Sequence, residues 1–164
     1  MKTIVKILAV LALVACVVTL FSACNSEGDD DEEDAFCVTY KNVEIKLGKS
    51  ADNVDKLGGS PISAGNCGKG ALYQYKFNDI VIEVLESEDG KKTVDKIDFL
   101  NDTLTTSKGV CIGDSSDKVV SAHGTPAQQT NSKIEYKDGN LSLVFVLENG
   151  NVSEIKYRHN TNGQ

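Results

Sequence analysis

The 164-residue chain has few of the residues that metal sites and nucleophilic sites need. It contains two histidines, His123 and His159, and no CxxC pair, HExxH motif or histidine cluster, so we expect neither a metal site nor a cofactor. A catalytic cysteine requires a base, but His123 is expected in the last turn of a helix, where it satisfies free carbonyls, and His159 in a polar tail. The sequence therefore predicts a protein that is not an enzyme.

Basic residues are also scarce. Lysine and arginine together number 17 against 24 acidic residues, giving a formal charge of −7, and no basic patch predicts a nucleic-acid partner. The glycine-rich run 65–70 lacks the spacing of a phosphate-binding loop. We interpret that run as a flexible loop tied by a disulfide.

The most informative segment is the N-terminus, where Lys2 and Lys6 precede an apolar run over 7–21. This pattern is typical of a secretory signal. The run ends at Phe21-Ser22-Ala23-Cys24, which resembles the Leu-[Ala/Ser]-[Gly/Ala]-Cys lipobox with Phe21 in the leucine position. The resemblance implies a signal peptide over 1–23, lipidation of Cys24 with palmitate-type chains, and a location on the extracytoplasmic face of the cell membrane.

The N-terminal segment has three alternative interpretations to lipidation at Cys24. Cleavage before Cys16 would leave the apolar segment 17–21 exposed at the mature N-terminus. A single transmembrane anchor is the second alternative, because the apolar stretch 4–23 is just long enough to span a bilayer. Plain secretion is the third, but Phe21 spoils an ordinary cleavage site. No basic stop-transfer flank follows Cys24, so we favour lipidation.

An acidic segment follows the lipidation site. Removal of the signal leaves 141 residues with 15 basic and 24 acidic side chains, and seven of these acids fall within 27–34. Like charges repel, so the linker 24–35 is expected to hold the following domain away from an anionic membrane or wall. Calcium binding is disfavoured because the glycine and terminal glutamate of an EF-hand loop are missing.

The remainder of the chain contains an internal repeat. The segment 48–54 recurs 65 positions later as 113–119, and Gly59 and Pro61 match Gly124 and Pro126. This repeat predicts one domain over 36–158, with repeat one at about 36–102, repeat two at about 103–158, and a polar tail at 159–164.

Each copy has the pattern of a β-α-β-β-β unit. A short apolar strand (43–47 or 110–112) leads to a helix capped by Ser50 or Ser115. Strands of period two follow, and Asp89-Gly90 and Asn149-Gly150 are hairpin signals. The predicted fold class is α+β, with two tandem β-α-β-β-β repeats that form an antiparallel sheet with short helices on one face.

The Gly-x-Ser-x-x-x-Val…Gly-x-Pro signature followed by three strands resembles the tandem-repeat fold of beta-lactamase inhibitory protein. It is more distantly similar to BamE/SmpA-type lipoproteins, and closest to Gram-positive surface lipoproteins with the same two-copy layout. These motifs are turns and helix caps, so the resemblance implies a fold and no catalytic residues. Inhibitory contacts cannot be matched residue by residue.

Three cysteines remain after the signal and lipidation site, and an odd number leaves one thiol over. Cys37 and Cys67 lie in the same repeat and are the favoured disulfide pair. A bridge that uses Cys111 is the alternative, because spacing does not fix connectivity.

A sheet with helices on one side leaves its other face open. The residues predicted there include Gln74, Lys76, Glu83 and Val144, together with Thr39, Glu44 and Lys46. We expect a non-catalytic binding module with a protein or cell-wall ligand and a lipid anchor in the membrane. The alternatives are a plain solvated sheet face and a cell-envelope hydrolase with an unrecognised site.

Overall fold

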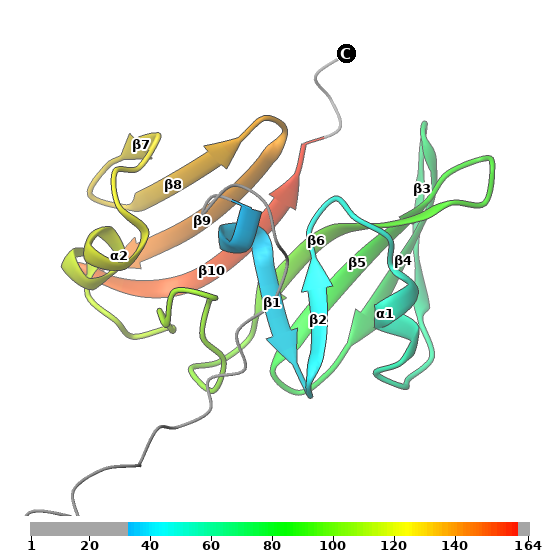
Figure 1. Ribbon diagram of the computed structural model, residues 1–164, viewed down its shortest axis with the longest axis horizontal. Coiled ribbons are helices and arrows are strands. Elements are labelled where there is room, and N and C mark those ends of the chain that lie inside the picture. The colour runs from blue at the N-terminus through cyan, green and yellow to red at the C-terminus, as the bar shows by residue number, and fades with distance from the viewer. Residues whose placement is uncertain (1–32, 161–164) are drawn as a thin grey trace, which may run out of the picture.

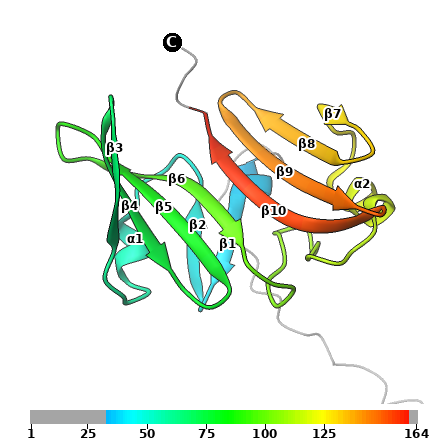
Figure 2. The same cartoon turned by 180° about the vertical axis from the view of Figure 1, so that it is seen from behind.

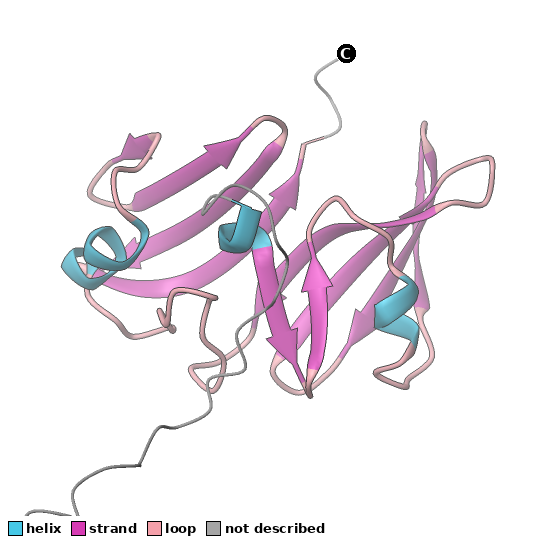
Figure 3. Cartoon of the chain, in the orientation of Figure 1, coloured by secondary structure: helices cyan, strands magenta, loops and turns pink. Residues whose placement is uncertain are grey.

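The computed structural model describes residues 33–160 (Figure 1), apart from the side chains of Glu33, Asp34, Ser63 and Cys67. Its class is α+β, as the sequence predicts: most residues lie in antiparallel strands, and the helices are few and short (Figure 3). The helices are η1 (Glu33–Phe36), α1 (Asp52–Asp55) and α2 (Ser116–His123). The signal peptide and Cys24 lie outside the described residues.

The strands form one large sheet and one small hairpin. The hairpin pairs β1 (Cys37–Tyr40) with β2 (Val43–Lys46). The eight-stranded sheet has the order β3-β4-β5-β6-β10-β9-β8-β7. Its strands are β3 (Ile62–Cys67), β4 (Gly70–Lys76), β5 (Ile80–Glu86), β6 (Lys92–Phe99), β7 (Gln128–Gln129), β8 (Lys133–Asp138), β9 (Leu141–Glu148) and β10 (Asn151–His159).

One face of the large sheet carries the core. Helices α1 and α2 and the β1–β2 hairpin lie on this face. Figure 2 shows the sheet in front of them. Side chains of period two point from the strands into the core, where they meet Val54 of α1 and Val119 of α2. Val54 and Val119 are 1% and 0% exposed. Burial of this apolar surface is the main stabilising contribution.

The structure contains two local features that the sequence predicts, the Asn149-Gly150 turn and the Ser115 helix cap. Asn149 and Gly150 have φ of 53° and 82° and connect the paired residues Glu148 and Asn151, the geometry that favours Asn-Gly. The Ser115 hydroxyl accepts a hydrogen bond from Lys118 N at 3.3 Å and caps α2.

The first helix is weaker than predicted. The N-cap of α1 is Ala51, without a side-chain cap, although the Ser50 hydroxyl accepts the Asp52 N–H at 3.3 Å. The helix has only four residues. Helices this short depend on tertiary packing because nucleation is unfavourable.

The strand predicted over 110–112 is not formed. Val110 is fully buried, but its N–H donates to the Thr106 hydroxyl and its carbonyl accepts the Thr106 N–H. A local turn therefore uses both backbone groups that a strand would need. The predicted strand 43–47 does form as β2, but it pairs with β1 and lies outside the large sheet.

The glycine-rich run 65–70 is also not a loop. Cys67 pairs with Gly70 in the β3–β4 hairpin. A Cβ built on Gly70 would lie 2.0 Å from the carbonyl oxygen of Glu86. Gly70 therefore allows a close approach between strands, which a glycine-free sequence could not make.

Candidate functional site

The open face of the large sheet brings together the four predicted binding residues. Gln74 lies opposite Glu83 across the β4–β5 pair. Lys76 is two residues further along β4, so it shares that face. Val144 on β9 lies opposite Lys156 on β10. The strand pairs β5–β6, β6–β10 and β10–β9 continue the same face from Glu83 to Val144. In Figure 2 this face is turned toward the reader.

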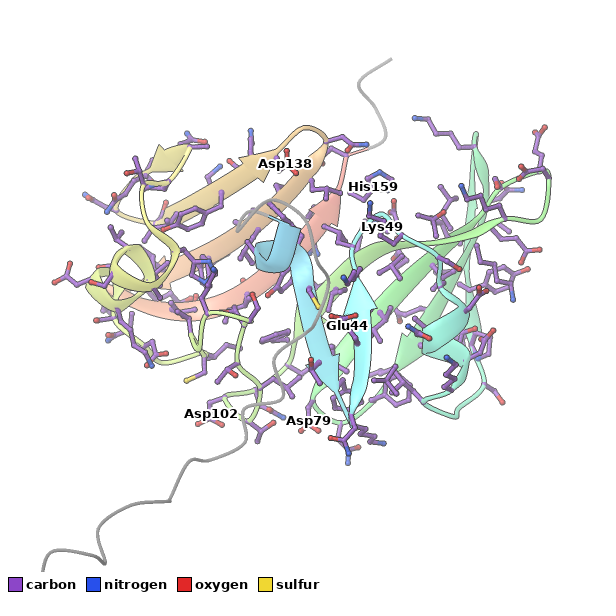
Figure 4. The ribbon with its side chains drawn as sticks, in the orientation of Figure 1. Glu44, Lys49, Asp79, Asp102, Asp138 and His159 are labelled. Atoms are coloured by element: carbon purple, nitrogen blue, oxygen red, sulfur yellow. The ribbon has the colours of Figure 1, made fainter. Side chains whose placement is uncertain are left out.

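Three further residues predicted on this face lie elsewhere. Thr39, Glu44 and Lys46 belong to the β1–β2 hairpin, which packs on the core side of the sheet (Figure 4). The prediction was wrong because it assigned residues 43–47 to the large sheet. The hairpin instead turns at Lys41 and Asn42, with φ of 49° and 62°, which non-glycine residues rarely adopt.

The open face has more basic than acidic groups. Lys96 pairs with Glu83 at 2.5 Å and Arg158 with Asp98 at 2.5 Å. Exposed pairs of this kind contribute little to stability, but they neutralise the carboxylates. On strands β4–β10 the face carries six basic residues (Lys76, Lys96, Lys133, Lys137, Lys156 and Arg158) and five acidic ones (Glu83, Asp98, Glu135, Glu148 and Glu154).

An apolar patch occupies the β3 end of the same face. Leu72 lies opposite Leu85, and Ile62 lies opposite Gln74. Ile62 is 58% exposed. Sequence reasoning missed Ile62 because the glycines that follow it predicted a loop, although its β-branched side chain was a weak strand signal.

The cysteines lie in separate environments. Cys37 is buried, and its thiol lies 3.4 Å from Glu44 Oε1. The Cys67 side chain lies outside the described residues, so the Cys37–Cys67 disulfide stays a prediction. Burial, and then the Asp114 carboxylate 3.4 Å from the sulfur, raise the pKa of Cys111. Cys111 is therefore protonated at neutral pH and a poor nucleophile.

His123 does not act as a cation at the helix end. It lies in the last turn of α2, as predicted, but its ring packs against Tyr136 and Phe145 with centroids 5.2 Å away in each case. Burial, with a smaller contribution from Lys108, lowers the pKa of His123 to about 4. The ring is therefore neutral near pH 7.

A cavity of about 570 Å³ opens beside His123, between the C-terminal end of α2, strand β8 and η1. Its lining includes Ala35, Lys108, Pro126 and Tyr136. The Tyr136 hydroxyl donates to the carbonyl of Gly124 at 3.1 Å and fixes one wall. No local sequence pattern predicts this cavity, because Lys108 and Tyr136 come from segments 28 positions apart.

His159, predicted in a polar tail, is the last residue of β10 and lies beside the loop that carries Lys49 (Figure 4). Its Nε2 lies 2.8 Å from Asn140 Nδ2, and its Nδ1 lies 3.8 Å from Asp95 Oδ1. The ordered strand therefore extends one residue beyond the predicted domain boundary.

Within residues 33–160 no three His, Cys, Asp or Glu side chains form a group that can hold a metal ion. In the same part of the chain no helix has the length and apolar character to cross a bilayer. Comparison with protein-family models, curated proteins and solved structures finds no match.

Proposed function

We propose that this protein is an extracytoplasmic lipoprotein, anchored in the cell membrane through Cys24, that acts as a non-catalytic binding module for a protein or cell-wall ligand. The observation that supports binding is the open sheet face, which runs over strands β3–β10 and is left uncovered by the helices and hairpin of residues 33–160 (Figure 2). Its mixture of charged and aliphatic side chains is typical of protein interfaces.

The distance from the anchor suits a tethered module. The described residues begin at Glu33, and eight residues lie between Glu33 and Cys24. Eight residues span at most about 30 Å. A ligand near the membrane or wall is within reach of a domain on such a tether.

In this proposal the domain consists of two copies of one unit, and the copies place their strands side by side to make a single face. Each half attaches the segment before its helix to its last strand in the same way. Gly48 N donates to Val94 O at 2.9 Å, and Gly113 N donates to Val152 O at 2.8 Å. The matched residues Tyr75 and Tyr136 each donate to the helix region of their own half, to Asp55 Oδ1 and Gly124 O respectively.

Affinity capture with the lipid-free protein tests the binding face. The variant Gln74→Arg/Val144→Arg places two bulky charges on the open face, one in each half. The control Ser60→Arg/Asn131→Arg adds the same charges at exposed positions outside the sheet. We expect a partner that the wild type and the control retain and that the open-face variant loses. Equal capture by all three proteins would contradict a role for this face.

A further inference from the structure

A partly buried polar pair lies next to the cavity beside α2, and His123, one member of the pair, lines that cavity. The Thr106 hydroxyl, on a residue 3% exposed, lies 3.1 Å from His123 Nε2. The same hydroxyl oxygen accepts the Val110 N–H at 3.2 Å, which leaves its own proton able to point to Nε2. In that arrangement the neutral ring carries its proton on Nδ1.

That second ring nitrogen is available to a ligand. Nδ1 of His123 makes no hydrogen bond to the part of the chain that the structure describes, and it is not among the buried polar atoms that lack a partner. It therefore reaches the surface, and His123 lines the cavity. An N–H donor held by packing and by Thr106 is in a fixed position, which reduces the entropy cost of binding.

Lys108 supplies a positive charge beside the His123 N–H donor. Lys108 lies in the turn closed by the hydrogen bond from Gly109 N to Thr106 O at 2.9 Å, and Thr106 attaches that turn to His123. Lys108 is exposed, lines the cavity, and is close enough to lower the pKa of His123. No ion pair joins Lys108 to another residue of 33–160. The positive charge of Lys108 also offsets the negative end of the α2 helix dipole.

The other lining residues are suited to contact the apolar part of a ligand. Ala122, Pro126, Ala127 and the Tyr136 ring line the cavity, and the Tyr136 hydroxyl is already used by Gly124. Asp138 stands among the lining residues as an acidic group. A second carboxylate on the ligand would be repelled there.

We propose that this cavity binds a small organic monocarboxylate, with its carboxylate held by Lys108 Nζ and His123 Nδ1–H and its apolar part against Pro126 and Tyr136. The site is separate from the open sheet face, so the test of this cavity does not depend on the proposed function. A cavity of this size can hold a ligand with one aromatic ring.

Histidine NMR on the full-length protein in detergent, with benzoate as the probe, tests the proposal. The chain has two histidines, so His123 reports the cavity and His159 serves as an internal reference. Benzoate at about 1–10 mM should shift the His123 signals with saturation. A bound anion favours imidazolium, so the pKa of His123 should rise by about 0.5–1 pH unit. Benzylamine, with the same ring and the opposite charge, should bind at least about tenfold more weakly.

Variants separate this site from non-specific binding. Lys108→Gln should weaken benzoate binding about tenfold, and Ala127→Phe, which fills the cavity, should abolish it. Lys91→Gln, an exposed lysine in the β5–β6 turn, is the matched control and should bind as the wild type does. Absence of saturable shifts at His123, equal shifts at His159, or unchanged binding by both cavity variants would overturn the proposal.

Discussion

At the scale of single residues, the environment of His123 decides its chemistry. An imidazole at a helix C-terminus is usually favoured as a cation, but burial against Tyr136 and Phe145 outweighs that effect and keeps the ring neutral. The cost of charging a buried group is larger than the dipole interaction, which is about 0.3–1 kcal/mol. The residue type alone does not decide whether burial or the helix dipole controls the pKa of such a histidine.

Acid should therefore destabilise the protein through His123. The unfolded state takes up a proton near pH 6.5 and the folded state only near pH 4. The stabilisation present above pH 6.5 is thus lost as pH falls toward 4, by about 1–2 kcal/mol after allowance for partial exposure. Urea unfolding at pH 7 and pH 4.5 should show a smaller loss in His123→Gln than in the wild type. An equal loss in both would refute the assignment.

Thiol mapping tests the redox prediction at the same scale. Mass spectrometry under non-reducing conditions should show Cys37 joined to Cys67 and Cys111 modified by iodoacetamide, slowly at pH 7 because its pKa is raised. Recovery of Cys37 as an alkylated thiol would remove the predicted disulfide and agree with the contact between Cys37 and Glu44.

At the scale of elements, the close approach of β4 to β5 depends on glycine at position 70. A methyl group on Gly70 would collide with the backbone of Glu86, whereas one on Gly68 would meet nothing within 4 Å. Backbone atoms of a paired strand cannot move aside as a flexible side chain can. The same residue type therefore has different importance two positions apart.

Gly70→Ala should lower the free energy of unfolding by about 2–3 kcal/mol, and Gly68→Ala should change it by less than about 0.5 kcal/mol. Urea titration followed by circular dichroism measures both. Equal stability of the two variants would show that the start of β4 does not approach the end of β5 as described.

The helices give a second comparison between elements. Val54 and Val119 are almost fully buried in α1 and α2, so aspartate at either position places an unpaired charge in the core. Both Val54→Asp and Val119→Asp should unfold the domain at 25 °C. If the protein with Asp at 54 remained folded, the four-residue α1 would contribute little to the core.

At the scale of the whole molecule, the proposed lipid anchor and the domain are tested separately. Two or three acyl chains contribute about 0.8 kcal/mol per buried methylene, which makes release from a membrane negligible. Cys24→Ser should therefore move the protein from the detergent phase to the aqueous phase, without the mass of the lipid. Unchanged mass and partitioning would contradict lipidation.

How far the sequence predicts this structure depends on how local each signal is. The Asn149-Gly150 turn, the Ser115 cap and the strands of period two are formed by neighbouring residues, and their patterns predicted them. The turn at Lys41 and Asn42 and the pairing of Thr106 with His123 were missed. The first uses residue types that seldom mark such a turn, and the second joins residues 17 positions apart, which no local pattern reveals.

The position of β10 has a consequence for how the chain is made. This strand is the last in the sequence, yet it lies between β6 and β9 in the middle of the sheet. During synthesis, the strands on its two sides cannot be joined until residues 151–159 have been made. Long-range pairing of this kind is slow. The eight-stranded sheet is therefore completed only after residues 151–159 are free to pair with both β6 and β9.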